Sequence, residues 1–167
     1  MEANIELRMD YNETEMKKAL SFYILRVRDI RTYVFVVYPI LFIAIILTLI
    51  FTDFALLPFV WFICGVIFFY FYYQRPIEGY LKGYKKIGSI LYRFYEDKVF
   101  VVGENVQSEC SWALFNKGYE IPSAFLLMDE NESLYVLPKT YFSNPWQIEQ
   151  MHSLLIAKIP SFKVYTP

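Results

Sequence analysis

The apolar positions near the start of the chain alternate with polar ones. Over residues 5–11 the period is two, which predicts a strand with one buried face. Its apolar positions are Ile5, Leu7, Met9 and Tyr11. Apolar residues over 12–29 then recur at helical spacing, and Asn12 with Glu15 forms a helix start signal. Because a lone strand is unstable, we expect this one to join a sheet formed by the C-terminal part of the chain.

The pattern then changes to an apolar segment over residues 31–76. Between its ends the segment carries one charge, Asp53. A bilayer core about 30 Å thick needs about 20 helical residues, and the uncharged runs 33–51 and 54–73 are each about that long. They predict a transmembrane helical hairpin that turns at Thr52 and Asp53. A pair of buried helices in a soluble core is the alternative.

Basic residues flank this hairpin on both sides and are absent from its connecting loop. By the positive-inside rule, both termini of the chain face the cytoplasm and the protein lies in the inner (cytoplasmic) membrane as a multi-pass protein. The flanking basic residues are Arg26, Arg28, Arg31, Arg75, Lys82, Lys85 and Lys86.

Residues 77–90 predict an amphipathic helix leaving the membrane. Its lysines, Lys82, Lys85 and Lys86, fall mostly off the apolar face. One interpretation is a connector packed on the soluble domain; the other is an interfacial helix whose lysines meet anionic lipid headgroups.

Short strands separated by turns follow. They predict a small antiparallel β domain, with strands at 90–95, 98–102, 106–112, 119–121, 124–128 and 134–137. A closing helix begins after Asn144 as N-cap, with Pro145 first and Gln147 as the capping partner, and Pro160 ends it.

Three C-terminal stretches resemble a known family. They read "LYRFYEDKVFV", "SWALFNKGYE" and "FLLMDENESLYVLPKTYF". They contain a "W…K…E" segment and a "PK…F" motif, formed by Trp112, Lys117, Glu120, Pro138, Lys139 and Phe142. The chain resembles the YcxB-like family of small bacterial membrane proteins. The resemblance implies a PH-like C-terminal domain, a bent antiparallel sheet closed by a helix. It implies no catalytic residues.

The expected fold class is therefore membrane α+β. We expect a two-span helical hairpin with a cytoplasmic PH-like β domain closed by a C-terminal helix. The expected divisions are 1–31 (cytoplasmic strand and helix), 32–74 (transmembrane hairpin), 75–88 (amphipathic connector) and 89–167 (PH-like domain).

Composition adds little chemistry to this picture. Hydrophobic residues make up 56% of the chain, above the usual value of about 45–50%, and the excess lies in the hairpin. The net charge of −1 gives no bias toward nucleic acid. The single histidine, His152, is expected at a surface or boundary. The residues predict no catalytic site, cofactor site or metal site.

Two residues are candidates for binding a partner. Trp112 is either a core residue or a partner contact, and Lys139 is either a solvated charge at a strand end or a ligand contact. We expect a membrane-anchored interaction module, not an enzyme, with the lipid bilayer as one partner. The β domain would bind a protein segment or lipid headgroups, and an immunity or toxin-neutralising role and a homo-oligomer are both left open. The alternative is an accessory subunit of a membrane enzyme or transporter complex.

Overall fold

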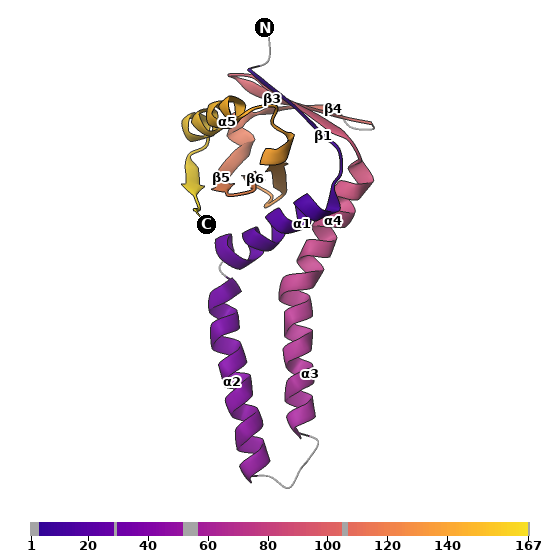
Figure 1. Cartoon of the computed structure of the whole chain (residues 1–167), viewed down its shortest axis with the longest axis vertical. Coiled ribbons are helices and arrows are strands. Elements are labelled where there is room, and N and C mark those ends of the chain that lie inside the picture. The colour runs from indigo at the N-terminus through magenta and orange to yellow at the C-terminus, as the bar shows by residue number, and fades with distance from the viewer. Residues whose placement is uncertain (1–3, 29, 52–56, 105–106, 167) are drawn as a thin grey trace. The chain divides into compact units, whose positions relative to one another are not determined.

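The computed structural model describes residues 4–28, 30–51, 57–104 and 107–166, without the side chains of 31–33, 51 and 57. The chain divides into two compact units (Figure 1). We call Met1–Ala19 with Leu81–Pro167 the β unit and Leu20–Tyr80 the helical unit. The boundaries fall within two helices, α1 (Glu13–Phe22) and α4 (Arg75–Ile87). The helical unit is therefore an insertion in the sequence of the β unit.

The first sheet of the β unit combines a strand from before this insertion with three from after it. Its order is β1-β2-β3-β4, antiparallel throughout. The strands are β1 (Ile5–Met9), β2 (Ile90–Phe94), β3 (Lys98–Gly103) and β4 (Gln107–Ser111). In β1 the buried Ile5, Leu7 and Met9 alternate with exposed residues, as the period of two predicts. The N-terminal strand thus pairs with β2, as expected from its need for a partner.

The second sheet has the order β7-β6-β5-β8. Its strands are β5 (Phe115–Ile121), β6 (Ala124–Asp129), β7 (Leu134–Pro138) and β8 (Ser161–Val164). The pairs of β6 are antiparallel, whereas β8 lies parallel to β5. A bulge between Phe115 and Lys117 shifts the register of β5 against β6. All six residues of β6 are buried, so this strand runs through the core.

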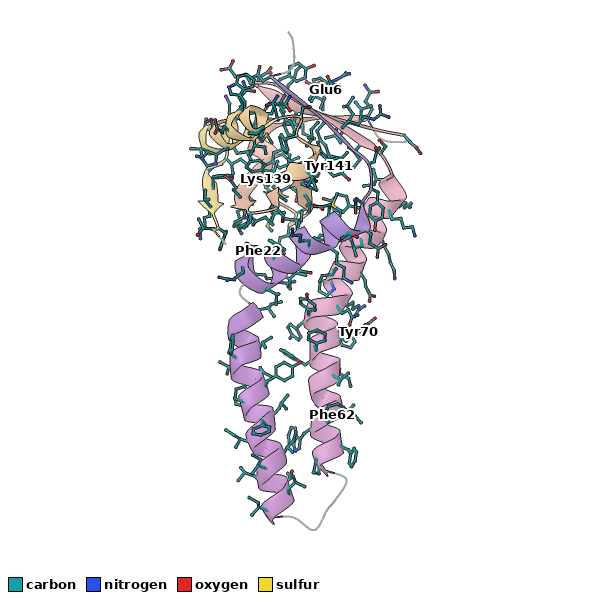
Figure 2. The ribbon with its side chains drawn as sticks, viewed as in Figure 1. Glu6, Phe22, Phe62, Tyr70, Lys139 and Tyr141 are labelled. Atoms are coloured by element: carbon teal, nitrogen blue, oxygen red, sulfur yellow. The ribbon has the colours of Figure 1, made fainter. Side chains whose placement is uncertain are left out.

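Short helices and turns complete the β unit. The 3-10 turns are η3 (Trp112–Leu114) and η4 (Lys139–Tyr141), and the closing helix is α5 (Pro145–Lys158). The side chain of Asn144 accepts a hydrogen bond of 2.9 Å from the N–H of Gln147, which confirms the predicted cap. The Tyr141 hydroxyl donates to the carbonyl of Asp10 at 2.6 Å and so ties η4 to the end of β1. Tyr141 and Lys139 are labelled in Figure 2.

A buried carboxylate shapes the turn between β6 and β7. One oxygen of Asp129 accepts hydrogen bonds from the N–H groups of Asn131 and Ser133, at 2.9 and 2.8 Å. In the same turn Glu132 has a φ of 61°, in the left-handed region. The aspartate supplies local acceptors that hold the turn in shape, which is the usual role of this residue type in tight turns.

The helical unit contains two long apolar helices. They are α2 (Ile30–Phe51) and α3 (Leu57–Phe69), and π-helical turns occupy Tyr23–Val27 and Tyr70–Gln74. The hydroxyl of Tyr38 donates to the carbonyl of Gly65 at 3.2 Å, linking α2 to α3. Phe62 and Tyr70, labelled in Figure 2, are among many large side chains that this unit leaves exposed.

The expected spans 33–51 and 54–73 fall mainly on α2, α3 and the turn after α3. In the part of the chain that the structure describes, no helix combines the length and the hydropathy of a membrane crossing. The turn expected at Thr52 and Asp53 lies outside the described residues, as do Asn105 and Val106 near the expected start of β4.

Most predicted strands have their observed boundaries within a residue or two. The exception is the short strand expected at 119–121, which is the end of the longer β5. No strand was predicted after Pro160, where β8 lies. This strand is short, with only Phe162 half-buried, and therefore lacks a clear alternating pattern.

Candidate functional site

The C-terminal part of α4 is fastened to the second sheet by one tyrosine. Tyr84 is buried, and its hydroxyl donates to the carbonyl of Leu134 at 2.8 Å. The same hydroxyl accepts a hydrogen bond from the N–H of Val136 at 2.7 Å. Both contacts lie within the β unit, so this part of α4 is packed on β7, as the connector interpretation expected.

The three lysines proposed for the membrane surface lie on the remaining surface of the same helix. Lys82, Lys85 and Lys86 are exposed, and we call them the basic face. At about 100° per residue, Lys82 and Lys86 point roughly opposite to Tyr84 and Lys85 points to the side. None of the three forms an ion pair with another described residue. The basic face is therefore open to an anionic surface while Tyr84 holds the helix.

A second group of charges is half-buried and internally paired. Glu120 of β5 accepts a hydrogen bond of 2.6 Å from the ammonium group of Lys139. Its other carboxylate oxygen contacts Nδ1 of His152 in α5. We call these three residues the Glu120 cluster. The side chains of Glu120 and Lys139 are only 15% and 20% exposed, so the ion pair is partly shielded from solvent.

Two aromatic rings contact the Glu120 cluster. The Lys139 ammonium lies 5.0 Å from the ring centre of Phe125, a favourable cation–π distance. The ring of Phe162, from β8, meets His152 edge-on at 5.8 Å. The contacts of the cluster thus connect five elements, namely β5, β6, β8, η4 and α5. These contacts hold the five elements against one another.

The charges of the Glu120 cluster alter the titration of its carboxylate. Burial by itself would raise the pKa of Glu120, but the hydrogen bonds and positive charge of Lys139 and His152 outweigh it. The net effect is to lower the pKa below its ordinary value. Glu120 is therefore held in its ionised, acceptor form, which favours a structural ion pair over a proton donor.

Of the two interpretations of Lys139, the structure disfavours a solvated charge at a strand end. Its ammonium group is already engaged by Glu120, and a ligand would have to compete for it. His152 lies at the boundary of the fold, as expected, but no pattern in the sequence signals its contact with Glu120. Glu120 and Lys139 were both singled out as motif residues, but no spacing between them signals an ion pair that only the fold creates.

The structure favours the core interpretation of Trp112. This residue is 5% exposed, and its indole N–H donates to the carbonyl of Tyr95 at 3.0 Å. The rings of Phe94 and Phe115 lie 6.0 and 6.1 Å from it. A partner could reach Trp112 only after this packing opened.

The described residues contain no group of three or more His, Cys, Asp or Glu side chains placed to hold a metal ion. Cys64 and Cys110 are free thiols. Neither the metal-ligand search nor the two thiols points to a catalytic site among the described residues.

These features define the class of the molecule as an α+β protein whose helical segment is inserted between two adjacent strands of one sheet. The model of the YcxB-like protein family matches residues 94–155. The family inferred from the sequence is thus confirmed over the range that contains Trp112 and the Glu120 cluster. The search of curated proteins and the search of solved structures each returned no match.

Proposed function

We propose that the chain is a membrane-anchored interaction module in which the helical unit enters the bilayer and the β unit is held at its cytoplasmic surface. One observation carries this proposal. The helical unit exposes a large number of bulky apolar side chains, and both ends of this unit continue into strands of a single sheet. An insertion of that kind fixes a folded domain to an apolar medium at two points.

The exposed apolar surface of the helical unit is the stronger support for membrane insertion. Soluble monomers rarely expose a continuous apolar patch larger than a few hundred Å². Here α2 and α3 leave bulky side chains exposed along their whole described lengths. They include Phe35, Ile40, Phe42, Leu49, Ile50, Phe59, Phe62 and Ile63, each more than half exposed. Lipid chains would remove this surface from water.

The β unit would then act as a PH-like domain. A fully antiparallel sheet, a second sheet that is antiparallel except for the β5–β8 pair, and the helix α5 are broadly like the arrangement that the family resemblance implies. Basic residues on both flanks of the helical unit favour the cytoplasmic side of the inner membrane. The basic face of α4 would meet anionic headgroups, each lysine contributing about 1 kcal/mol near the surface.

Extraction and labelling test the anchor. The protein should stay in the pellet after alkaline carbonate treatment of membranes. A cysteine at position 53 (Asp53→Cys), made with Cys64 and Cys110 changed to serine, should react with an impermeant reagent outside intact cells. A cysteine replacing Ser133 should react only after lysis. Release by carbonate would refute insertion, and labelling of position 133 alone would refute the orientation.

Charge reversal tests the basic face. Changing Lys82, Lys85 and Lys86 to glutamate should leave insertion intact. The change should increase the distance from the β unit to a headgroup label in anionic nanodiscs, with little effect in neutral ones. The matched control reverses Lys158 and Lys163 of the same unit. Equal distances before and after the triple change would show that these lysines are only a solvated helix face.

A second candidate is an accessory subunit of a membrane enzyme or transporter complex. It is favoured by an apolar groove of about 440 Å³ along α2 and α3, lined by residues that include Tyr38, Phe42, Trp61 and Val66. A helix from a partner subunit would fill such a groove. Mild co-purification from native membranes tests this candidate, because an accessory subunit would stay in a stoichiometric complex.

A further inference from the structure

A groove opens in the β unit where the start of β1 faces α5. Its volume is about 490 Å³. Residues that line it include Asn4 and Ile5 on one side and Trp146, Glu149, Gln150 and Leu154 of α5 on the other. We call it the β1–α5 groove. It is separate from both the basic face and the Glu120 cluster.

Two of its residues are arranged in a way that internal packing does not explain. Trp146 is 63% exposed, although an indole ring normally buries most of its surface in a fold. The side-chain oxygen of Gln150 is buried and has no hydrogen-bond partner among the described residues. Buried acceptors are nearly always paired, so the Gln150 side chain would have to turn toward the groove for this oxygen to meet a donor.

Among the described residues, the charge around the groove is negative. Glu149 lines it directly. Asn4 donates its N–H to the carbonyl of Phe94 at 2.9 Å, which places the turn after β2, with Glu96 and Asp97, at the same end of the sheet. None of these three carboxylates forms an ion pair with a described residue, and the nearby Lys98 is engaged by Glu109 at 3.0 Å. A cationic ligand would complement this end of the β unit.

We propose that the β1–α5 groove binds an extended segment of a partner protein that presents Lys or Arg beside an aliphatic residue. The cation would lie against the ring of Trp146 and the carboxylate of Glu149, a combination of cation–π and ionic attraction. The aliphatic side chain of the segment would pack on Leu154. Tryptophan is enriched among the residues that dominate binding at interfaces.

This inference deepens the proposed interaction function and rests on it only in requiring a protein partner. Membrane insertion is tested separately by carbonate extraction, so failure of one leaves the other standing. An exposed tryptophan can also insert among lipid headgroups. Insertion of Trp146 among lipid headgroups is one of the outcomes that the experiment below distinguishes.

The test selects binding peptides from a displayed library of random seven-residue peptides, with the full chain in neutral nanodiscs as the target. Wild type should enrich peptides with Lys or Arg next to Val, Ile or Leu. Trp146→Ala should reduce this enrichment about tenfold or more. Ile156→Ala is the matched control, since it removes another large exposed side chain of α5 that does not line the groove; it should enrich the same peptides as wild type.

A consensus peptide made from the enriched set then measures affinity. Glu149→Lys should raise its Kd about tenfold or more, and added salt should weaken the wild-type complex. The proposal is overturned if no peptide is enriched, if acidic peptides are enriched, or if Trp146→Ala enriches as wild type does. It is also overturned if Trp146→Ala changes only the binding of the β unit to lipid.

Discussion

The hydroxyl of Tyr84 and the backbone N–H of Val136 lie 2.7 Å apart and form a buried hydrogen bond. The same hydroxyl donates to the carbonyl of Leu134 at 2.8 Å. These two backbone groups belong to β7, which ends the second sheet. A free strand edge is a template for unwanted strand pairing. One tyrosine therefore both fastens the C-terminal part of α4 within the β unit and occupies part of the otherwise unpaired edge of β7.

Tyr84→Phe should destabilise the β unit. The change keeps the ring but leaves the N–H of Val136 and the carbonyl of Leu134 without their partner. A buried group left unpaired costs about 1–3 kcal/mol. The thermal midpoint should fall, and the amide of Val136 should exchange faster with deuterium. Tyr95→Phe, which removes a hydroxyl from a half-exposed ring, is the control and should change neither value by a comparable amount.

Acid should weaken the fold through Glu120. Because the pKa of this carboxyl is lower in the folded state than its ordinary value of 4.5, the unfolded chain binds the proton more tightly. The contribution of Glu120 to stability is therefore present above about pH 4.5 and is lost as the pH falls through the folded pKa.

The check is a series of thermal midpoints between about pH 6 and about pH 3. Wild type should lose stability faster than Glu120→Gln toward the acid end, so their difference should shrink. Glu130→Gln, at an exposed position, should follow the wild-type slope. Parallel curves for wild type and Glu120→Gln would show that this ion pair does not set the acid response.

The sequence could predict those elements that are determined by residues close together in the chain. The alternation of Ile5, Leu7 and Met9 and the cap at Asn144 both depend on neighbouring residues, and both have the expected structure. The pairing of β1 with β2 could also be inferred, because no other sheet was available to bury its apolar face.

What the sequence could not predict depends on contacts between distant residues. Glu120 meets His152 only because β5 and α5 pack together, and neither residue type requires the other. The position of β8 depends on a space above Gly118 that Phe162 fills. The β1–α5 groove has the same origin, since Asn4 and Trp146 are brought together by the sheet and the closing helix.

Leu7→Ala should cost far more stability than a change at the next position. The side chain of Leu7 is fully buried, and truncating a buried leucine costs about 2–5 kcal/mol. Glu6, on the opposite face of β1, contributes a surface ion pair of 3.5 Å to Arg93, so Glu6→Ala should cost about 0–1 kcal/mol. Urea unfolding of both variants gives the comparison. If Leu7→Ala proved as stable as Glu6→Ala, β1 would not be part of the cooperative fold.

Adding a methyl group to Gly118 should loosen the C-terminal strand. A Cβ at this position would lie 2.8 Å from a ring carbon of Phe162 and 2.9 Å from the end of the Ile159 side chain. Both distances are too short. Ile159 is buried, and Phe162 is paired directly beside Gly118, so its ring must shift to admit the methyl group. Overpacking of this kind costs about 1–3 kcal/mol.

Gly118→Ala should therefore lower the thermal midpoint and speed exchange at the amide of Tyr165, which donates to the Glu120 carbonyl at 2.8 Å. Adding Phe162→Ala should relieve part of the strain, so the two changes together should cost less than their sum. Gly83→Ala is the control, since a Cβ there meets nothing within 4 Å. In the middle of α4 it should stabilise by about 0.5–1 kcal/mol. Stability changes of the same sign at Gly118 and Gly83 would contradict the close approach of Phe162 to β5.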